Sequence, residues 1–500
     1  VFALAPSRLE PNVIWAGSDD GLVHVTRDDG RSWQNVTPAG LPPFLKITTI
    51  EDSPTRPGTA FLAGNRFLLD DLAPYLLRTD DYGQHWTSIA AGLPADEMVR
   101  SVREDTSRPG LLYIGTERGV KVSFDDGRRW QSLQRELPVV QVSDLAVTDH
   151  DLVIATHGRS FWVLDNIDVI RQLGRPVAGK PGVRLFRPAP AVRGVDEGVI
   201  IDYYLPRPPR SLTLDILDSR GQPVWHFIGA PEDPEKAKKK KKAEEEALGQ
   251  GGGEDDDDET VPKPGMKAGL NRYTWDMNYP GYTEFKDMIL WAAANHGPAA
   301  LPGEYQVRLT VDGKVQTQTA AIRLDPRLGS VKPADVEARF ALATRIRDQV
   351  SRANQAVLLA RGIRRQVAAV LTKTSDPSLR SLANALDARV VAVEGAIYQV
   401  RNRSEQDPLN YPIMLNNKLA ALIGVVESGE AAPTLQTQSV FTDLSARLDR
   451  ELAELDRLLA VDMPVLNAQL KRNRLPTIER RSEAAVEQGT ANRKDDDGDR

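Results

Sequence analysis

Carboxylates and one histidine stand at predicted turns in the first third of the chain, where they could act as acids and bases. They are two adjacent carboxylates, Asp70 and Asp71, followed by Glu117 and His157. Paired carboxylates can cleave a glycosidic bond, one as the acid and the other as the base or nucleophile. Adjacent residues rarely supply both groups, so this segment contains no identifiable catalytic motif, and these four residues are catalytic candidates only.

Other polar residues at the same kind of turn are candidates for ligand binding. They are Asp19, Asp20, Arg66, Tyr75, Arg118 and Arg159. Asp and Gly in tight turns also serve backbone geometry alone, and the His157-Gly158-Arg159 stretch can satisfy a local hydrogen-bond network. Both interpretations stay open for these residues.

A repeated pattern positions these turns. Residues 26–33, 79–86 and 123–130, called the repeated turns below, share the sequence Ser/Thr-x-Asp-x-Gly-x-x-Trp. Their tryptophans are about 45–50 residues apart, a period typical of propeller blades and other repeat arrays. A fourth copy, residues 152–166, keeps two strands and loses the pattern, as terminal repeats commonly do.

The spacing within the pattern predicts a closed hairpin turn. The Asp side chain accepts hydrogen bonds from backbone N–H groups further along the turn, the Gly supplies positive φ, and the Trp fills the apolar space beneath. We therefore assign these residues to structure and not to catalysis. They are Asp28, Gly30, Trp33, Asp81, Gly83, Trp86, Asp125, Gly127 and Trp130.

With these three copies the chain resembles the Asp-box (BNR) propellers, which include sialidases, xyloglucanase-type glycoside hydrolases and the sortilin-type family. The resemblance implies that the motif is a fold element remote from any active site. The stretches at 70–83, 155–166 and 415–426 are similar to the C-terminal part of large bacterial sortilin-type proteins, often labelled glycosyl hydrolases. The cysteine-rich module of the eukaryotic sortilin receptors is missing.

The predicted blades have two distinct faces. A four-stranded meander places its turns alternately on two faces, so the repeated turns lie on one face and the turns between second and third strands lie on the other. We expect function on the face opposite the repeated turns. There, residues 65–75 form the longest predicted loop, and long loops on rigid scaffolds often carry function.

The predicted architecture is multidomain. Residues 1–170 are expected to be the C-terminal blades of an Asp-box β-propeller. Short strands in 184–330 favour an Ig-like β-sandwich, interrupted by a charged insertion, 235–260, that is expected to be disordered. Helical spacing of apolar residues predicts an antiparallel α-helical bundle in 333–470, followed by a disordered tail, 471–500.

Composition excludes several classes of partner and cofactor. The 500 residues carry a net charge of −6, so we expect no nucleic acid partner. No apolar run approaches the ~20 residues of a membrane span. Cysteine is absent, which rules out disulfides and cysteine metal sites, and we expect no metal and no cofactor.

The chain begins at Val1 inside a repeat. We therefore expect it to be part of a longer protein, with upstream blades as its partners and any signal peptide upstream. The resemblance implies a secreted or periplasmic protein. Two functions stay open: a binding or scaffold protein that recognises a peptide or glycan on the face opposite the repeated turns, and a glycoside hydrolase with a carboxylate pair in the propeller channel.

Overall fold

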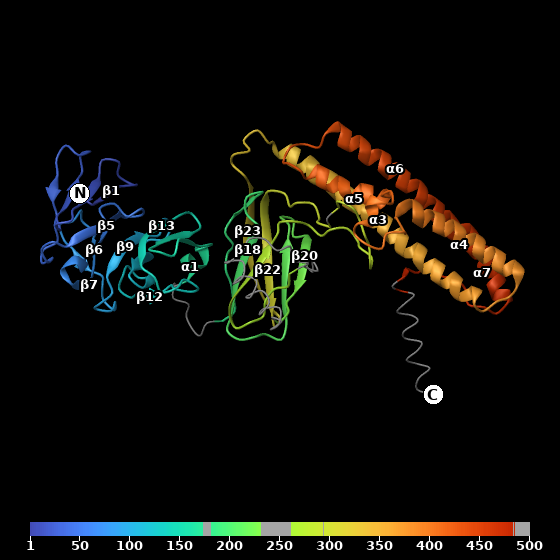
Figure 1. The fold of residues 1–500 in the computed structure, drawn as a ribbon, viewed down its shortest axis with the longest axis horizontal. Coiled ribbons are helices and arrows are strands. Elements are labelled where there is room, and N and C mark those ends of the chain that lie inside the picture. The colour runs from blue at the N-terminus through green and yellow to red at the C-terminus, as the bar shows by residue number, and fades with distance from the viewer. Residues whose placement is uncertain (174–181, 232–261, 294, 484, 486–500) are drawn as a thin grey trace, which may run out of the picture. The chain divides into compact units, whose positions relative to one another are not determined.

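The computed structural model describes residues 1–173, 182–231, 262–293, 295–483 and 485 (Figure 1). The chain forms two compact units. Unit 1 comprises residues 1–189, 200–208 and 268–271, and unit 2 comprises residues 190–199, 209–267 and 272–500. The charged insertion and the last fifteen residues of the predicted tail, 486–500, lie outside the described residues.

Unit 1 begins with four successive antiparallel meanders. The first three have four strands each, hydrogen-bonded in sequence order, and the fourth has three. The first two meanders contain β1 (Ala3–Pro6), β2 (Ile14–Gly17), β3 (Val23–Thr26), β4 (Gln34–Asn35), β5 (Lys46–Asp52), β6 (Ala60–Arg66), β7 (Asp71–Thr79) and β8 (Thr87–Ser88). The last two contain β9 (Val99–Glu104), β10 (Leu112–Thr116), β11 (Gly119–Ser123), β12 (Gln131–Ser132), β13 (Val142–Val147), β14 (Leu152–Thr156) and β15 (Phe161–Leu164).

Apolar side chains from consecutive meanders form shared cores. Trp15 and Val25 of the first meander pack with Leu62 of the second, and Leu76 of the second packs with Ile114 of the third. Alternate strand residues point to opposite sides of a sheet, so each meander can bury both faces between its neighbours. This repeated packing of four-stranded meanders is the architecture of propeller blades.

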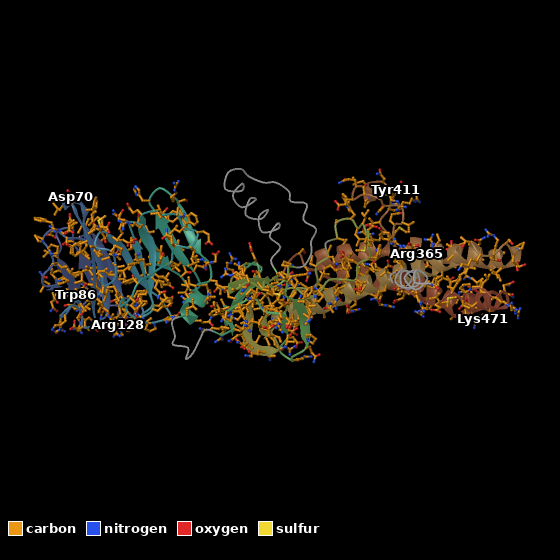
Figure 2. All side chains as sticks on the ribbon, turned by 90° about the horizontal axis from the view of Figure 1, so that it is seen from below. Asp70, Trp86, Arg128, Arg365, Tyr411 and Lys471 are labelled. Carbon is orange, nitrogen blue, oxygen red and sulfur yellow. The ribbon has the colours of Figure 1, made fainter. Side chains whose placement is uncertain are left out.

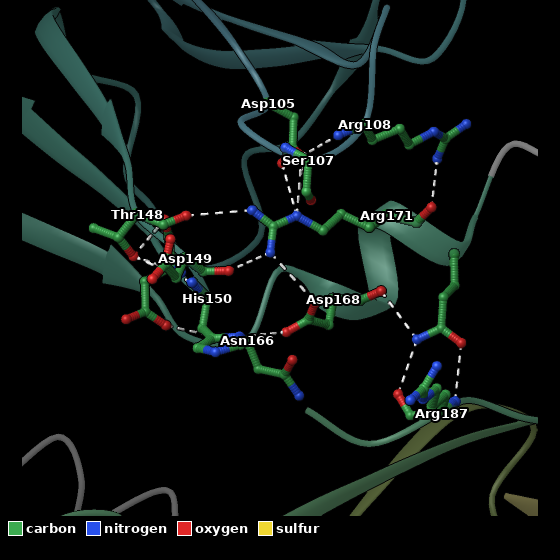
Figure 3. A network of polar contacts seen from close by, with 12 residues as sticks. Asp105, Ser107, Arg108, Thr148, Asp149, His150, Asn166, Asp168, Arg171 and Arg187 are labelled. Carbon is green, nitrogen blue, oxygen red and sulfur yellow. Dashed lines mark hydrogen bonds and ion pairs between the residues drawn. The ribbon is translucent and has the colours of Figure 1, made fainter. Parts of the chain in front are cut away.

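A short helix, α1 (Asp168–Gln172), follows the fourth meander and is fixed by a polar network (Figure 3). Arg171 on this helix forms an ion pair with Asp105, with Nε 2.9 Å from Oδ2, and donates to the carbonyls of Thr148 and Asp149. The Asp105 side chain is completely buried. The helix thereby connects the ends of the first strands of the third and fourth meanders.

Two further sheets follow. One contains β16 (Arg184–Leu185), β18 (Val199–Leu205) and β21 (Gly269–Trp275). The other has the order β17 (Ala191–Arg193), β23 (Lys314–Leu324), β22 (Gly303–Val311), β19 (Leu212–Leu217) and β20 (Pro223–Ile228). Within unit 2 the rings of Phe227 and Tyr273 lie 4.8 Å apart and those of Trp275 and Tyr305 5.2 Å apart, so the two sheets face each other there. The Ig-like topology of these strands stays a prediction.

The rest of unit 2 is helical. It contains α3 (Pro333–Leu371), α4 (Pro377–Ile397), α5 (Leu415–Val426), α6 (Leu435–Arg457) and α7 (Met463–Arg472) around one apolar core. Asp376 caps α4 by accepting from the backbone N–H of Ser378 at 2.8 Å. Ile478, inside the predicted tail, is 2% exposed and belongs to the helical core. No helix among the described residues is long and apolar enough to cross a bilayer.

The connection between β21 and β22 packs into these helices. Phe285 belongs to the helical core, and the backbone N–H of Trp291 donates to Asn417 of α5 at 2.8 Å. His296 Nδ1 lies 3.2 Å from Glu427 Oε2, which raises the pKa of the imidazole. Helices and sheets of unit 2 are therefore joined by this connection.

Candidate functional site

The repeated turns are closed by their own side chains. In the first, Asp28 Oδ1 accepts from the Thr26 hydroxyl at 2.8 Å and from the Ser32 backbone N–H at 2.8 Å, while Gly30 N–H donates to Thr26 Oγ1 at 2.9 Å. The other two turns repeat these three hydrogen bonds with Thr79, Asp81, Gly83, His85, Ser123, Asp125, Gly127 and Arg129. The Ser32 hydroxyl is the main cause that lowers the pKa of Asp28 to about 2.

Two tryptophans of the repeated turns connect neighbouring meanders. Trp86 donates its indole N–H to the Val36 carbonyl of the preceding meander at 2.8 Å, and Trp130 donates to Ile89 in the same way at 2.8 Å. Trp33, in the first meander, is 44% exposed. Trp86 and Trp130 therefore connect neighbouring meanders, and Asp28, Asp81 and Asp125 are engaged in closing their own turns.

The candidate residues of the second meander lie at the end remote from these turns. Figure 2 shows Asp70 at the opposite end of the meanders from Trp86 and Arg128. Instead of a long loop, β6 and β7 continue the ladder until Arg66 faces Asp71. One 3₁₀ turn, Phe67–Leu69, joins them, and Asp70 follows in the left-handed conformation with φ 60°.

Three of the predicted site residues meet at the base of this hairpin. Arg66 Nη1 lies 2.8 Å from Asp71 Oδ2, and the Tyr75 hydroxyl donates to the same oxygen at 2.6 Å. The backbone N–H of Ala73 donates to Asp71 Oδ1 at 3.1 Å. The Tyr75 hydroxyl is the main cause that lowers the pKa of Asp71. Asp71 is thus occupied in holding the hairpin, and Asp70 is exposed beside it.

Apolar side chains project from the tip of the hairpin. Leu68 is 79% exposed and Leu69 53%, with Phe67 and Leu72 also exposed. The guanidinium of Arg100 lies 5.2 Å from the centre of the Phe67 ring. Arg100 also forms an ion pair with Glu117. Glu117, the site candidate from the third meander, therefore lies near the hairpin tip.

The remaining candidates lie on separate turns. Asp20 accepts from the Ser18 hydroxyl, which lowers its pKa, and Asp19 is exposed beside it. Arg118 pairs with Asp96 at 2.6 Å. His157 and Arg159 are exposed on the β14–β15 turn. The structure gathers Arg66, Asp71, Tyr75 and Glu117 near one hairpin and leaves these others dispersed.

A pocket of about 820 Å³ lies along the first strands of the four meanders. These strands, β1, β5, β9 and β13, are neighbours in space. The pocket is lined on one side by β1 and on the others by Thr49 and Glu51 of β5, Arg103 of β9, and Ser143 and Asp144 of β13. It therefore offers carboxylates, a guanidinium and hydroxyl groups to a polar ligand.

Arg103 joins two carboxylates across this pocket. Its Nη2 lies 2.7 Å from Asp144 Oδ1, and its Nη1 lies 3.6 Å from Glu51 Oε2. Burial raises the pKa of Glu51 to about 7, against the opposing charge of Arg103. With its pKa raised towards neutrality, Glu51 is suited to donate a proton, and Asp144 is held by the same guanidinium.

Glu51, Arg103 and Asp144 lie on strands, outside the turns that the repeated pattern points to, and were therefore not predicted. Their signal was a charged residue on a first strand in which apolar and polar residues are mixed, as in the segments 47–52 and 99–104. The first strands of the four meanders are neighbours in space and line the pocket. In the described part of the chain, no group of three His, Asp or Glu side chains is placed to hold a metal.

The chain matches no protein-family model and no curated protein sequence. Among solved structures it is similar to a GH74 xyloglucanase from Xanthomonas campestris, with 18% identity and a TM-score of 0.28 over 43% of this chain and 36% of that one. An ancestral GH74 enzyme gives 14% identity and a TM-score of 0.28 over 63% and 47%. YCF48 bound to D1 peptide gives 14% identity and a TM-score of 0.24 over 45% and 68%.

The chain thus spans about a third of the length of the xyloglucanase that it matches. Its own repeated meanders define the class: this is a protein with β-propeller blades, followed by β-sheets and a helical region. No closer assignment follows from the fold.

Proposed function

We propose that the chain is the ligand-binding part of a sortilin-like Asp-box propeller protein, secreted or periplasmic, that acts as a binding or scaffold protein. Its ligand is a peptide or a glycan, held on the face opposite the repeated turns. The β6–β7 hairpin supports this proposal: it presents exposed Leu68 and Leu69 on a base fixed by Arg66, Asp71 and Tyr75. Exposed apolar groups on a rigid polar base are typical of binding surfaces.

A peptide and glycan array probed with the full chain tests this proposal. Replacing Leu68 and Leu69 by Ser removes the apolar tip and leaves the ion pair beneath it, so affinity for any captured ligand should fall at least tenfold. Leu435→Ser is the matched control, because Leu435 is 80% exposed on a helix of unit 2. Equal binding by the hairpin variant and the wild type would show that the ligand lies elsewhere.

The second candidate function is glycoside hydrolysis in the pocket of the first strands. This function is supported by the ion pairs that Arg103 forms with both Glu51 and Asp144. Glu51 would protonate the glycosidic oxygen as the bond to the anomeric carbon breaks, while Asp144 takes a proton from the water whose oxygen bonds to that carbon. Inverting enzymes use carboxyl groups about 6.5–9.5 Å apart.

Turnover of a glycan by the full chain would favour this second function. Glu51→Gln and Asp144→Asn should each then lower kcat at least 10²-fold, the usual contribution of a general acid or base. Saturable binding without product, unaffected by either substitution, would eliminate the hydrolase function.

The proposed location outside the cytoplasm is tested by fractionation of cells that express the protein. A cytoplasmic pool alone would contradict this location.

A further inference from the structure

A groove in the helical part of unit 2 lies between α3 and α6. Its volume is about 480 Å³, within the range of about 300–1,000 Å³ that ligand pockets occupy. Apart from Phe441 and Ala446, every lining residue is polar or charged. The residues that matter for its chemistry are Arg345, Gln349 and Arg352 of α3 and Phe441, Ser445 and Asp449 of α6.

Two contacts between the helices mark the ends of this groove. The guanidinium carbon of Arg345 lies 4.8 Å from the centre of the Phe441 ring, and Arg352 Nη1 lies 3.0 Å from Asp449 Oδ1. The second contact is two turns further along both helices, so the helices run in the same direction here. At a rise of about 1.5 Å per residue the two contacts are about 10 Å apart.

Arg345 supplies a cation that has no counter-charge in the protein. Both lining carboxylates are paired with other arginines, and in the part of the chain that the structure describes Arg345 forms no ion pair. Its guanidinium stacks on the Phe441 ring instead. An arginine held over a ring keeps its N–H groups free for a carboxylate or another oxyanion.

Ser445 adds an unused hydroxyl to the same groove. It lies one turn from Phe441 and one turn from Asp449, on the same face of α6. Its Oγ is buried and has no hydrogen-bond partner among the described residues. Hydroxyls on helices often donate to the carbonyl one turn back, as Thr442 does to Gln438 at 2.9 Å. A buried polar group without a partner costs free energy, and a ligand hydroxyl in the groove would remove that cost.

We propose that this groove binds a saccharide that carries one carboxylate, as in a uronic acid. The carboxylate accepts from the planar fork of Arg345, whose N–H groups match its two oxygens. The sugar hydroxyls meet Ser445, Gln349 Nε2 and Asp449 Oδ2. The last two atoms remain free because Arg352 contacts Gln349 Oε1 and Asp449 Oδ1. This site goes beyond the proposed function, whose ligand lies on unit 1.

The charges and the shape of the lining favour this class of ligand. Asp348 and Asp449 line the groove beside the one free guanidinium, and nearby carboxylates disfavour a dianion such as phosphate because like charges repel. A peptide would need an apolar anchor point, but the Phe441 ring is 3% exposed and lies beneath Arg345. A ligand rich in hydroxyls with a single negative charge satisfies this lining.

The test is calorimetric titration of the full 500-residue chain with cellobiouronic acid, a disaccharide with one carboxylate. We expect saturable binding, at least tenfold weaker for its methyl ester, which keeps the rings and the hydroxyls and loses the charge. Arg345→Gln should weaken binding of the acid at least tenfold. Arg447→Gln is the matched control on α6, because Arg447 lies outside the groove and is 44% exposed, and it should leave the affinity unchanged.

Ser445→Ala separates binding from folding. It removes a hydroxyl that has no partner in the protein, so the unfolding temperature should not fall, whereas the affinity for the acid should fall several-fold. A lower unfolding temperature with unchanged affinity would contradict the proposed role of Ser445 in the site.

Three further outcomes would overturn the proposal. They are no saturable binding of the acid, equal affinity for the acid and its methyl ester, and displacement of the acid by an equal concentration of inorganic phosphate, which would indicate a general anion site. The acid and its ester are compared on the wild-type chain, so the test stands even if Arg345→Gln fails to fold. Loss of the Leu68 and Leu69 tip should leave this binding unchanged, which separates it from the proposed function.

Discussion

Arg171 makes more polar contacts than its neighbours on α1 (Figure 3). Its ion-pair partner Asp105 is completely buried, so loss of either side chain should destabilise this part of unit 1. Asp105→Asn removes the buried carboxylate and leaves Arg171 with only the looser pair to Asp168, at 3.3 Å, as its counter-charge. Removal of one partner from a buried ion pair costs about 3–5 kcal/mol, so amide exchange in β14 should accelerate strongly. Asp456→Asn, whose pair with Arg480 is 62% and 61% exposed, should change exchange little anywhere.

Glu51 should make the stability of unit 1 depend on pH. Its folded pKa of about 7 lies above the ordinary value of 4.5, so the folded state holds the proton more tightly than the unfolded chain does. Glu51 therefore has no effect below pH 4.5, and it lowers the free energy of unfolding progressively as pH rises towards 7, by an amount on the order of 3 kcal/mol.

The measurement is urea unfolding of the wild type and Glu51→Gln at pH 5 and pH 8. Glutamine keeps the shape and cannot ionise, so the variant should lose less stability between the two pH values than the wild type. Parallel pH dependence of the two proteins would contradict the raised pKa of Glu51.

Single residues were predictable from the sequence where spacing encodes their contacts. The Asp, Gly and Trp of the repeated turns follow from local hydrogen bonds and backbone geometry. Glu51 and Asp144 were not predictable, because Arg103, which joins them, is 52 residues from the one and 41 from the other along the chain. The strand neighbours that bring them together are set by the packing of whole meanders.

At the scale of elements, the glycines of the repeated turns have different neighbours. Gly30 and Gly83 both have positive φ, 82° and 84°. A Cβ on Gly30 would meet nothing within 4 Å, whereas a Cβ on Gly83 would lie 2.7 Å from the Val36 Cβ of the preceding meander. Gly83 is therefore required both by its turn and by the close approach of two meanders.

Alanine substitution separates these two requirements. Gly30→Ala should cost about 1–2 kcal/mol, the price of the left-handed conformation. Gly83→Ala should cost about 1–3 kcal/mol more, because the new methyl group overpacks the boundary with Val36. Thermal unfolding of the two variants measures the difference, and equal costs would show that the boundary can relax freely.

Elements were predicted well where apolar residues repeat at a regular spacing over a long segment, and poorly where a short connection joins two strands. The apolar spacing of 379–400 predicts a helix, and α4 ends at Ile397. The segment 65–75 has no period of its own, so its extension of the β6–β7 ladder was missed. The contact of Trp291 with Asn417 of α5 likewise depends on tertiary packing.

At the scale of the whole molecule, one glutamate connects the sheets and the helices of unit 2. Glu430 accepts from Arg193 of β17 at 3.1 Å and from Arg339 of α3 at 2.6 Å. Both arginine side chains are at most 5% exposed. Sequence patterns predicted a sandwich and a bundle as separate domains, and this contact, which spans 237 residues, is invisible to local patterns.

Glu430→Gln should destabilise unit 2 by about 3–5 kcal/mol, because two buried guanidinium groups lose their shared counter-charge. Calorimetry should show sheets and helices of unit 2 melting together at a lower temperature. Asp449→Asn is the control, since its pair with Arg352 is half exposed, and it should leave the transition in place.

The indole bonds between meanders also affect how the chain is synthesised. The carbonyl of Val36 receives its partner only after Trp86 has left the ribosome, and that of Ile89 only after Trp130. The first and second meanders thus complete these hydrogen bonds only after the next meander has been synthesised. A nascent chain stalled before Trp86 would carry an unfinished boundary, and trypsin should cut it more readily than a chain released after Trp130.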